Sequence, residues 1–151
     1  RDAQRMQCAV KLGADYVIDV EKENLTERVM EITGGRPVDV AIDVSGSPEA
    51  IVNSMRLTKC QGILVSAGLT GNQTLTPFPM DEFVVKEITM RGAMSKPTEA
   101  VIATRNLLET GKYPVEEMVT HRYSLEQTEE CIHAIAGKIE GQYPIKAVII
   151  P

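Results

Sequence analysis

The chain has 151 residues, 43% hydrophobic and 25% charged, which is typical of one globular domain and excludes a collagen, an extended coiled coil or a disordered segment. The net charge is −5 and no block of Lys or Arg occurs, so we expect neither a nucleic acid nor an anionic membrane as partner. No apolar run approaches the roughly 18 residues that a membrane span needs. Because the first residue is Arg1 and not Met, we expect the numbering to begin inside a longer protein.

The cysteines and histidines are scattered. Cys8, Cys60 and Cys131 are too far apart for a CxxC metal site or a disulfide framework, and we expect each to be a small buried residue. Unpaired cysteines favour a reducing compartment, which indicates the cytoplasm. His121 and His133 form no HExxH pattern. Because catalytic zinc needs three protein ligands, we expect no metal site made wholly within this chain.

The first third of the chain reads as a helix, a short strand, a helix and a strand. Apolar residues at helical spacing predict a helix over 2–12, and the apolar run 16–18 has strand character. Asn24 is a typical cap for a second helix, which a Gly-Gly pair would end. The segment 38–44 is apolar on both faces in its middle, as expected of a strand covered by helices on both sides.

The remaining elements continue this alternation. Ser47 followed by proline predicts a capped helix, 62–68 (GILVSAG) a strand, and 71–79 a loop. Then follow a strand over 88–94 and a helix that opens at Pro97.

The last part of the chain adds one helix and one strand. Ser124 and Gln127 form a capping box that opens a helix, and 145–150 is a final strand. Strands separated by crossover helices predict an α/β fold with a parallel doubly wound sheet.

Ligands of an open α/β sheet bind outside the carboxyl ends of its strands. The residues that follow three of the predicted strands are small or apolar, and they could clamp a flat, amide-bearing ring through backbone hydrogen bonds. Tight turns alone would explain them equally well, and no catalytic set emerges. The GxGxxG loop of dinucleotide folds is absent, so the chain either binds something else or starts after that loop. The candidate residues are Val44, Ser45, Ala67, Gly68, Leu69, Ala93, Met94 and Ser95.

Several spaced motifs resemble one family over essentially the whole chain. They are LGADYVIDVEKENLTERVMEITGGRPVDVAIDVSGSPEAIVNSMRLTKCQGILVSAGLTG, then KEITMRGAM, LLETGK, VTHRYSLEQTEECIHAI and IKAVIIP. In this order they resemble the carboxy-terminal portion of the medium-chain dehydrogenases/reductases, the zinc-dependent alcohol-dehydrogenase-like family.

The resemblance implies a partial doubly wound (Rossmann-like) parallel sheet that lacks its first strand and glycine-rich loop. Residues 1–115 would belong to the nucleotide-binding domain, and 116–151 would be a return segment that packs with the catalytic domain. The cofactor would be NAD or NADP. Zinc would be held by ligands outside this chain, and the chain itself would carry no catalytic residue.

The resemblance also implies roles for the candidate residues. Val44 and Ser45 would flank the cofactor, and the backbone of Ala67, Gly68 and Leu69 would meet the nicotinamide carboxamide. Ala93, Met94 and Ser95 would complete this wall. Arg5 would lie against the adenosine ribose and Lys146 would reach the pyrophosphate, where a cation offsets phosphate charge; without the resemblance, both are ordinary exposed charges.

The implied function is an NAD(P)-dependent alcohol or polyol dehydrogenase acting on a small-molecule alcohol. A zinc-independent quinone or enoyl reductase of the same superfamily is the first alternative, although VTHRYSLEQ resembles the zinc branch more closely. A non-catalytic dimerisation fragment is the second, because in this family the strand near Ile88 to Met94 pairs two subunits into a homodimer or homotetramer. We expect the chain alone to be inactive.

Overall fold

The computed structural model describes residues 3–71, 76–94 and 97–151. The chain divides into two compact units, and each is described by itself. Residues 18–96 form the first, which we call the sheet unit, and residues 1–17 with 97–151 form the second, which we call the two-segment unit. The predicted boundary at 115/116 concerns the domains of a larger enzyme, and it stays a prediction.

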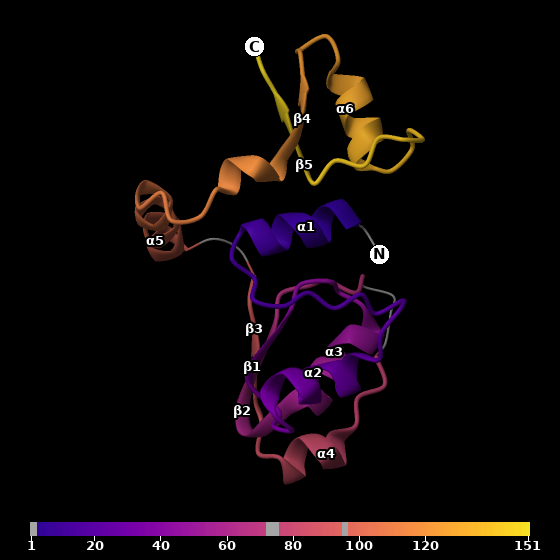
Figure 1. Cartoon of the computed structure of the whole chain (residues 1–151), viewed down its shortest axis with the longest axis vertical. Coiled ribbons are helices and arrows are strands. Elements are labelled where there is room, and N and C mark those ends of the chain that lie inside the picture. The colour runs from indigo at the N-terminus through magenta and orange to yellow at the C-terminus, as the bar shows by residue number, and fades with distance from the viewer. Residues whose placement is uncertain (1–2, 72–75, 95–96) are drawn as a thin grey trace. The chain divides into compact units, whose positions relative to one another are not determined.

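The sheet unit contains a three-stranded parallel sheet in the order β1-β2-β3 (Figure 1). The α/β class and the parallel sheet predicted from the sequence are thereby confirmed. Each strand is followed or preceded by a helix, and the elements are α2 (Leu25–Thr33), β1 (Val38–Asp43), α3 (Pro48–Leu57), β2 (Thr58–Ser66), α4 (Met80–Val85) and β3 (Thr89–Gly92).

The core of the sheet unit forms where α3 packs on β1 and β2. Met55 from the helix and Leu64 from the sheet are fully buried, and Ile51 and Ile88 complete the cluster. The helix begins as predicted, because the Ser47 hydroxyl accepts a hydrogen bond from the amide of residue 50 and proline occupies the first turn. These caps and the apolar face together fix α3 against the sheet.

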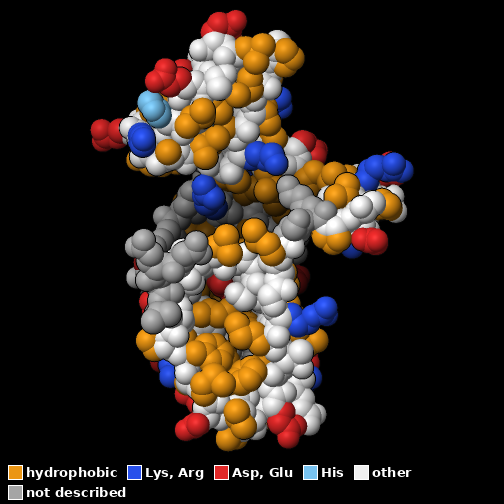
Figure 2. All heavy atoms as spheres, turned by 180° about the vertical axis from the view of Figure 1, so that it is seen from behind, with side chains coloured by type: hydrophobic (Ala, Val, Ile, Leu, Met, Phe, Trp, Pro, Cys, Tyr) orange, Lys and Arg blue, Asp and Glu red, His pale blue; other side chains and the backbone are white. Residues whose placement is uncertain are grey.

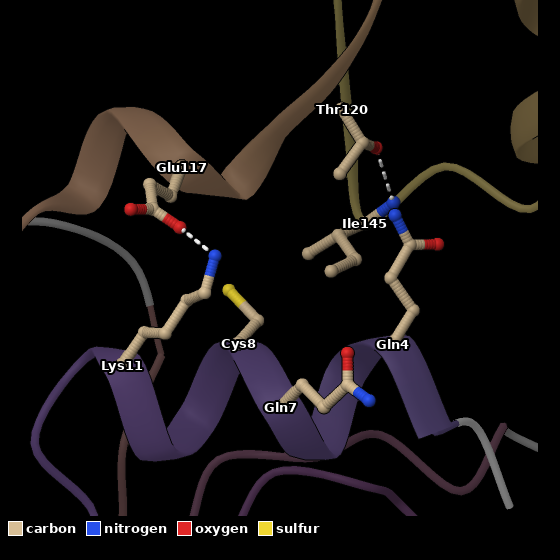
Figure 3. Close-up of a pocket in the computed structure, with 7 residues that line it drawn as sticks. All are labelled: Gln4, Gln7, Cys8, Lys11, Glu117, Thr120 and Ile145. Carbon is tan, nitrogen blue, oxygen red and sulfur yellow. Dashed lines mark hydrogen bonds and ion pairs between the residues drawn. The ribbon is translucent and has the colours of Figure 1, made fainter.

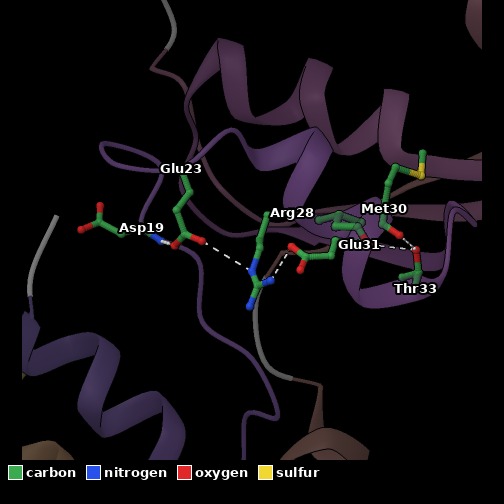
Figure 4. Close-up of polar contacts among 7 residues, drawn as sticks. Asp19, Glu23, Arg28, Met30, Glu31 and Thr33 are labelled. Atoms are coloured by element: carbon green, nitrogen blue, oxygen red, sulfur yellow. Dashed lines mark hydrogen bonds and ion pairs between the residues drawn. The ribbon is translucent and has the colours of Figure 1, made fainter.

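Helix α2 is also capped as predicted and is linked to the segment before it by polar contacts (Figure 4). The Asn24 side chain accepts from the amide of residue 27, and Gly34 ends the helix with a positive φ of 66°. On the helix surface, the Arg28 guanidinium forms ion pairs with Glu23 and Glu31.

The other face of β1 is less covered than the sequence predicts. Val40 is 49% and Ile42 63% exposed, and Ile63 on β2 is 39% exposed, whereas Ala41 and Leu64, which alternate with them, face α3. Apolar side chains gather on the side of this unit seen in Figure 2. Helices of the sheet unit therefore cover one face of the strands and leave apolar side chains on the other.

Two expectations are corrected, and one element was not predicted. The run 16–18, which spans the boundary between the two units, is not a strand, because no strand among the described residues pairs with it. The short helix α4 was not predicted. Cys60 is exposed: the register of β1 on β2 jumps from Val38↔Thr58 to Val40↔Ile63, so this part of β2 leaves the regular ladder.

The two-segment unit contains a pair of parallel strands and four helical segments. The strands β4 and β5 pair directly, and Tyr123, Cys131 and Ala134 form the buried cluster between them and α6. Cys8 and Cys131 are buried, as predicted. The elements are α1 (Ala3–Lys11), α5 (Thr98–Glu109), the 3-10 helix η1 (Val115–Met118), β4 (Val119–Tyr123), α6 (Thr128–Ile135) and β5 (Lys146–Ile149).

The start of α6 differs from the predicted capping box. The Gln127 side chain accepts from the Ser124 amide at 3.1 Å, which is one half of the box, but the Ser124 hydroxyl donates to Glu126 instead. The helix therefore begins at Thr128. The sequence also did not predict β4 or η1. No helix in the described part of the chain is long and apolar enough to cross a membrane.

Candidate functional site

The candidate site lies at the carboxyl ends of the three parallel strands of the sheet unit. The turn after β2 is tied to the end of β1, because the Asp43 carbonyl accepts hydrogen bonds from the amides of Ala67 at 2.8 Å and Gly68 at 3.2 Å. The end of β3 is tied to β2 in turn, since the Ala93 amide donates to the Ser66 carbonyl at 2.9 Å. The structure thus brings the residues predicted after these strands to one edge.

The carboxylate of Asp43 organises the turn that follows β1. This side chain is buried, at 5% exposure, and accepts from the amide and the hydroxyl of Ser45 at 3.0 and 2.6 Å. The Ser45 hydroxyl accepts in turn from the amide of Ser47, the residue that caps α3. A chain of hydrogen bonds therefore runs from the strand end to the helix start and fixes the position of Ser45.

Two glycines let the turns after β1 and β2 touch. A Cβ added to Gly68 would lie 2.0 Å from the Gly46 nitrogen, and one added to Gly46 would lie 2.2 Å from the Leu69 carbonyl oxygen. Gly46 also has a φ of +68°, which side-chain-bearing residues rarely adopt. The close approach of these two backbones leaves no room for any other residue at either position.

Around these turns, three apolar side chains stand exposed at neighbouring strand ends. Val44, Leu69 and Met94 are 75%, 75% and 76% exposed, well above the exposure usual for such residues. Ser95, the remaining predicted residue of this group, lies outside the described residues. The strand ends therefore offer apolar surface beside backbone polar groups.

Hydrogen bonds within the sheet unit already use some of the backbone groups at this edge. The amides of Ala67, Gly68 and Ala93 already donate within the sheet unit, so a ligand at this edge would meet the carbonyl oxygens of these residues rather than their amides. A planar ring with an amino donor and apolar faces fits such an edge, since carbonyls would accept from the amino group while apolar side chains contact the ring.

The two predicted basic residues belong to the two-segment unit. The Arg5 guanidinium donates from Nη2 to the Pro144 carbonyl at 2.9 Å, and Lys146 is exposed at the start of β5. Arg5 thus contacts the short segment that leads into Lys146, because Pro144 precedes Lys146 by two residues. Their contact with a ligand stays a prediction.

A cavity of about 210 Å³ lies in the two-segment unit between α1, η1 and the start of β5 (Figure 3). Lys11 and Glu117 form an ion pair across it, which raises the pKa of the Lys11 ammonium group. Within 3–71, 76–94 and 97–151, no group of three His, Cys, Asp or Glu side chains could hold a metal ion. The cavity is lined by Gln4, Gln7, Cys8, Lys11, Glu117, Thr120 and Ile145.

Sequence reasoning missed the residues that hold the site together. Asp43 lies in the predicted strand 38–44, but its burial and its bonds to Ser45 were not predicted. An Asp near the end of an apolar strand, shortly before Ser-Gly-Ser, is a signal that could have indicated them. Gly46 carries a similar signal, because a glycine between two serines at a strand end indicates a tight backbone approach.

A parallel sheet with helical crossovers, whose strand ends meet at one edge, has a Rossmann-like α/β architecture. The sequence pattern of the zinc-binding dehydrogenases matches residues 1–109, and the chain belongs to this family. This confirms the resemblance recognised in the sequence.

Relatives with assigned names are dehydrogenases. The chain is similar to a probable alcohol dehydrogenase of Mycobacterium tuberculosis, with 33% identity over all of this chain and 41% of that protein. It is 35% identical to a D-arabitol-phosphate dehydrogenase of Enterococcus avium over 89% of this chain and 38% of that protein. The chain thus spans about two fifths of the length of these relatives and corresponds to their carboxy-terminal portion.

Solved structures show the same fold. An alcohol dehydrogenase from Thermotoga maritima superposes with a TM-score of 0.89, covering 99% of this chain and 41% of that one, at 23% identity. An alcohol dehydrogenase from Thermus has a TM-score of 0.87 over 100% of this chain and 42% of that one, at 24% identity.

Proposed function

We propose that the chain is the carboxy-terminal, coenzyme-binding portion of an NAD(P)-dependent dehydrogenase that oxidises a small-molecule alcohol or polyol. Family membership and the names of the relatives support this reaction class. The observation that carries the proposal is the edge where Gly46 and Gly68 bring two strand ends into contact. Closely packed backbone and exposed apolar side chains occur together at these strand ends, as a nicotinamide ring requires.

Each part of this edge has a task in the proposed enzyme. The carbonyls of Ala67 and Ala93 accept from the nicotinamide carboxamide and set the angle of the ring. Val44, Leu69 and Met94 contact its faces and exclude water from the reacting carbon. Lys146 and Arg5, which belong to the two-segment unit and not to this edge, have the tasks that the family resemblance implies, at the pyrophosphate and at the adenosine ribose. The nicotinamide, when bound, supplies the acceptor for the hydride.

The proposal extends to zinc, cofactor and compartment. A catalytic zinc in the intact enzyme would be held by residues outside this chain, and both NAD and NADP are compatible with the described residues. The unpaired cysteines favour a cytoplasmic enzyme. The zinc-independent reductase is the second candidate, but the family match favours the zinc branch.

The proposal is tested by placing a charge beside the ring in the intact enzyme. We expect Leu69→Asp to raise the dissociation constant of the dinucleotide at least about tenfold, because a carboxylate would meet the apolar ring and the nearby phosphates. The measurement is a fluorescence titration with NADH and NADPH. Val84→Asp is the matched control: Val84 is exposed on α4, which precedes β3 and so lies toward the opposite ends of the strands.

Unchanged affinity in the Leu69→Asp variant would contradict the proposed site. The 151-residue chain by itself should oxidise no alcohol, since the residues that would hold zinc and substrate are not among those described. Measurable NAD(P)-dependent alcohol oxidation by the purified chain would contradict the proposal that zinc and substrate are held by residues outside it. If the intact enzyme binds neither NADH nor NADPH, the proposed function is wrong and the non-catalytic dimerisation fragment is the remaining alternative.

A further inference from the structure

The two strands of the two-segment unit are not in a continuous register. Val119 pairs with Lys146 and His121 with Ala147, so Thr120 is an extra residue in β4. Bulges are uncommon in parallel pairs, and they often occur where a side chain is aimed at a functional site. This bulge lies directly opposite the first residue of β5, Lys146.

The side chain of Thr120 replaces the ladder contacts that the bulge interrupts. Its hydroxyl oxygen accepts a hydrogen bond from the Ile145 amide at 3.0 Å (Figure 3). The same oxygen lies 3.0 Å from His121 Nδ1 and 3.5 Å from the Lys146 carbonyl oxygen. The peptide that leads into Lys146 is thus held by a side chain from the neighbouring strand.

A second contact holds the same segment from α1. The Arg5 guanidinium donates to the carbonyl of Pro144, which is buried. The peptide group that joins Pro144 to Ile145 is therefore anchored at both of its polar atoms, the carbonyl by Arg5 and the amide by Thr120. Beyond them, Ala147 packs against the cluster around Tyr123, so alternation along β5 turns the Lys146 side chain away from this cluster.

We propose that Thr120 is a positioning residue that aims the Lys146 ammonium group at the cofactor pyrophosphate. The inference rests on the proposed function, because Lys146 has this role only if the enzyme binds a dinucleotide. A lysine side chain is long and flexible, so its value as a phosphate ligand depends on a fixed starting backbone. Thr120 supplies that fixed point and makes no contact with the cofactor itself.

The test uses the intact enzyme and three variants. Thr120→Val keeps the β-branched shape and removes the hydroxyl, Thr120→Ser keeps the hydroxyl, and Lys146→Met removes the cation. We expect Thr120→Val to raise the dissociation constant and KM of the dinucleotide about three- to tenfold, the change that loss of one hydrogen bond produces, with kcat altered less than about twofold. Thr120→Ser should restore binding.

Two further measurements separate positioning from a general loss of stability. In a Lys146→Met background, Thr120→Val should cause no additional loss of affinity, because the group it aims is gone. Hydrogen exchange at the Ile145 amide should accelerate in Thr120→Val and not in Thr120→Ser.

Distinct results would overturn the inference. Unchanged affinity in Thr120→Val, no rescue by Thr120→Ser, or an equal loss with and without Lys146 would each show that Thr120 does not act through the lysine. If the unsubstituted enzyme binds neither dinucleotide, the proposed function itself falls, and that failure is visible before any variant is made.

Discussion

At the scale of single residues, one charge pair joins the amino-terminal ends of β1 and β2, away from the candidate site. The Lys59 ammonium lies beside the Asp39 carboxylate and holds the pKa of that carboxyl below its ordinary value. Both side chains are largely exposed, so solvent screens the pair. The pair belongs to the stretch where β2 leaves its regular register with β1.

The contribution of this pair to the stability of the fold depends on pH in a defined direction. Because the folded-state pKa of Asp39 is lowered, the pair stabilises the fold above the unfolded pKa, and this contribution is lost as pH falls through the lowered folded pKa. We expect Lys59→Met to raise the pKa of Asp39, measured by NMR titration of its carboxyl carbon. The pKa of Asp19, lowered chiefly by Lys22, should stay the same. An unchanged pKa of Asp39 would show that Lys59 does not act on it.

At the scale of elements, the candidate site is a junction between two turns rather than a set of side chains. Asp43 binds the turn after its own strand through its carboxylate and the turn after β2 through its carbonyl. The backbones of Gly46 and Gly68 are in direct contact at this junction. Its geometry therefore depends on the absence of side chains at two positions.

A single methyl group should break this junction. We expect Gly68→Ala to lower the free energy of unfolding by more than about 2 kcal/mol, because its Cβ would lie 2.0 Å from the Gly46 nitrogen, and backbone cannot yield as a flexible side chain does. Urea denaturation measures the change. Gly92→Ala is the control, since nothing lies within 4 Å of a Cβ there, and it should change stability by less than about 0.5 kcal/mol. Equal stability of the two variants would contradict the close contact.

At the scale of the whole molecule, the sheet of the sheet unit has two edges at which no further strand among the described residues pairs. Both β1 and β3 are outer strands of the described sheet, and every residue of β3 is exposed. Open edges present unpaired backbone groups that invite pairing with another strand. The family resemblance implies association near Ile88 to Met94, which includes β3, and a pairing of two such edges would be isologous.

Association through β3 can be measured directly. We expect light scattering of the chain to show a dimer or tetramer, and Met90→Lys to shift it towards monomer, because lysine on an edge strand opposes pairing. Val40→Lys is the matched control on β1, where the replaced side chain is exposed to a similar extent, and it should leave the assembly intact. A monomer at high concentration, or equal effects of both variants, would count against the β3 interface.

The sequence by itself determined the order and type of most elements, because caps and apolar periodicity are local properties. Asn24, Ser47 and the run 62–68 each mark an element that the structure contains. Motifs spread over the chain also determined the family. The strand ends that carry the candidate site could be located in the same way, since each follows directly from where an apolar run stops.

Only the tertiary structure decided those features that depend on residues far apart in the sequence, such as strand pairing, burial and contacts between turns. The run 16–18 has strand composition but no neighbouring strand, so it is not a strand, whereas 119–123 becomes one because β5 lies beside it. Cys60 is exposed because β2 leaves its ladder, and Thr120 meets Ile145 because β4 bulges. Hydrogen bonds between strands and contacts between turns join residues far apart in sequence, and no local pattern encodes their geometry.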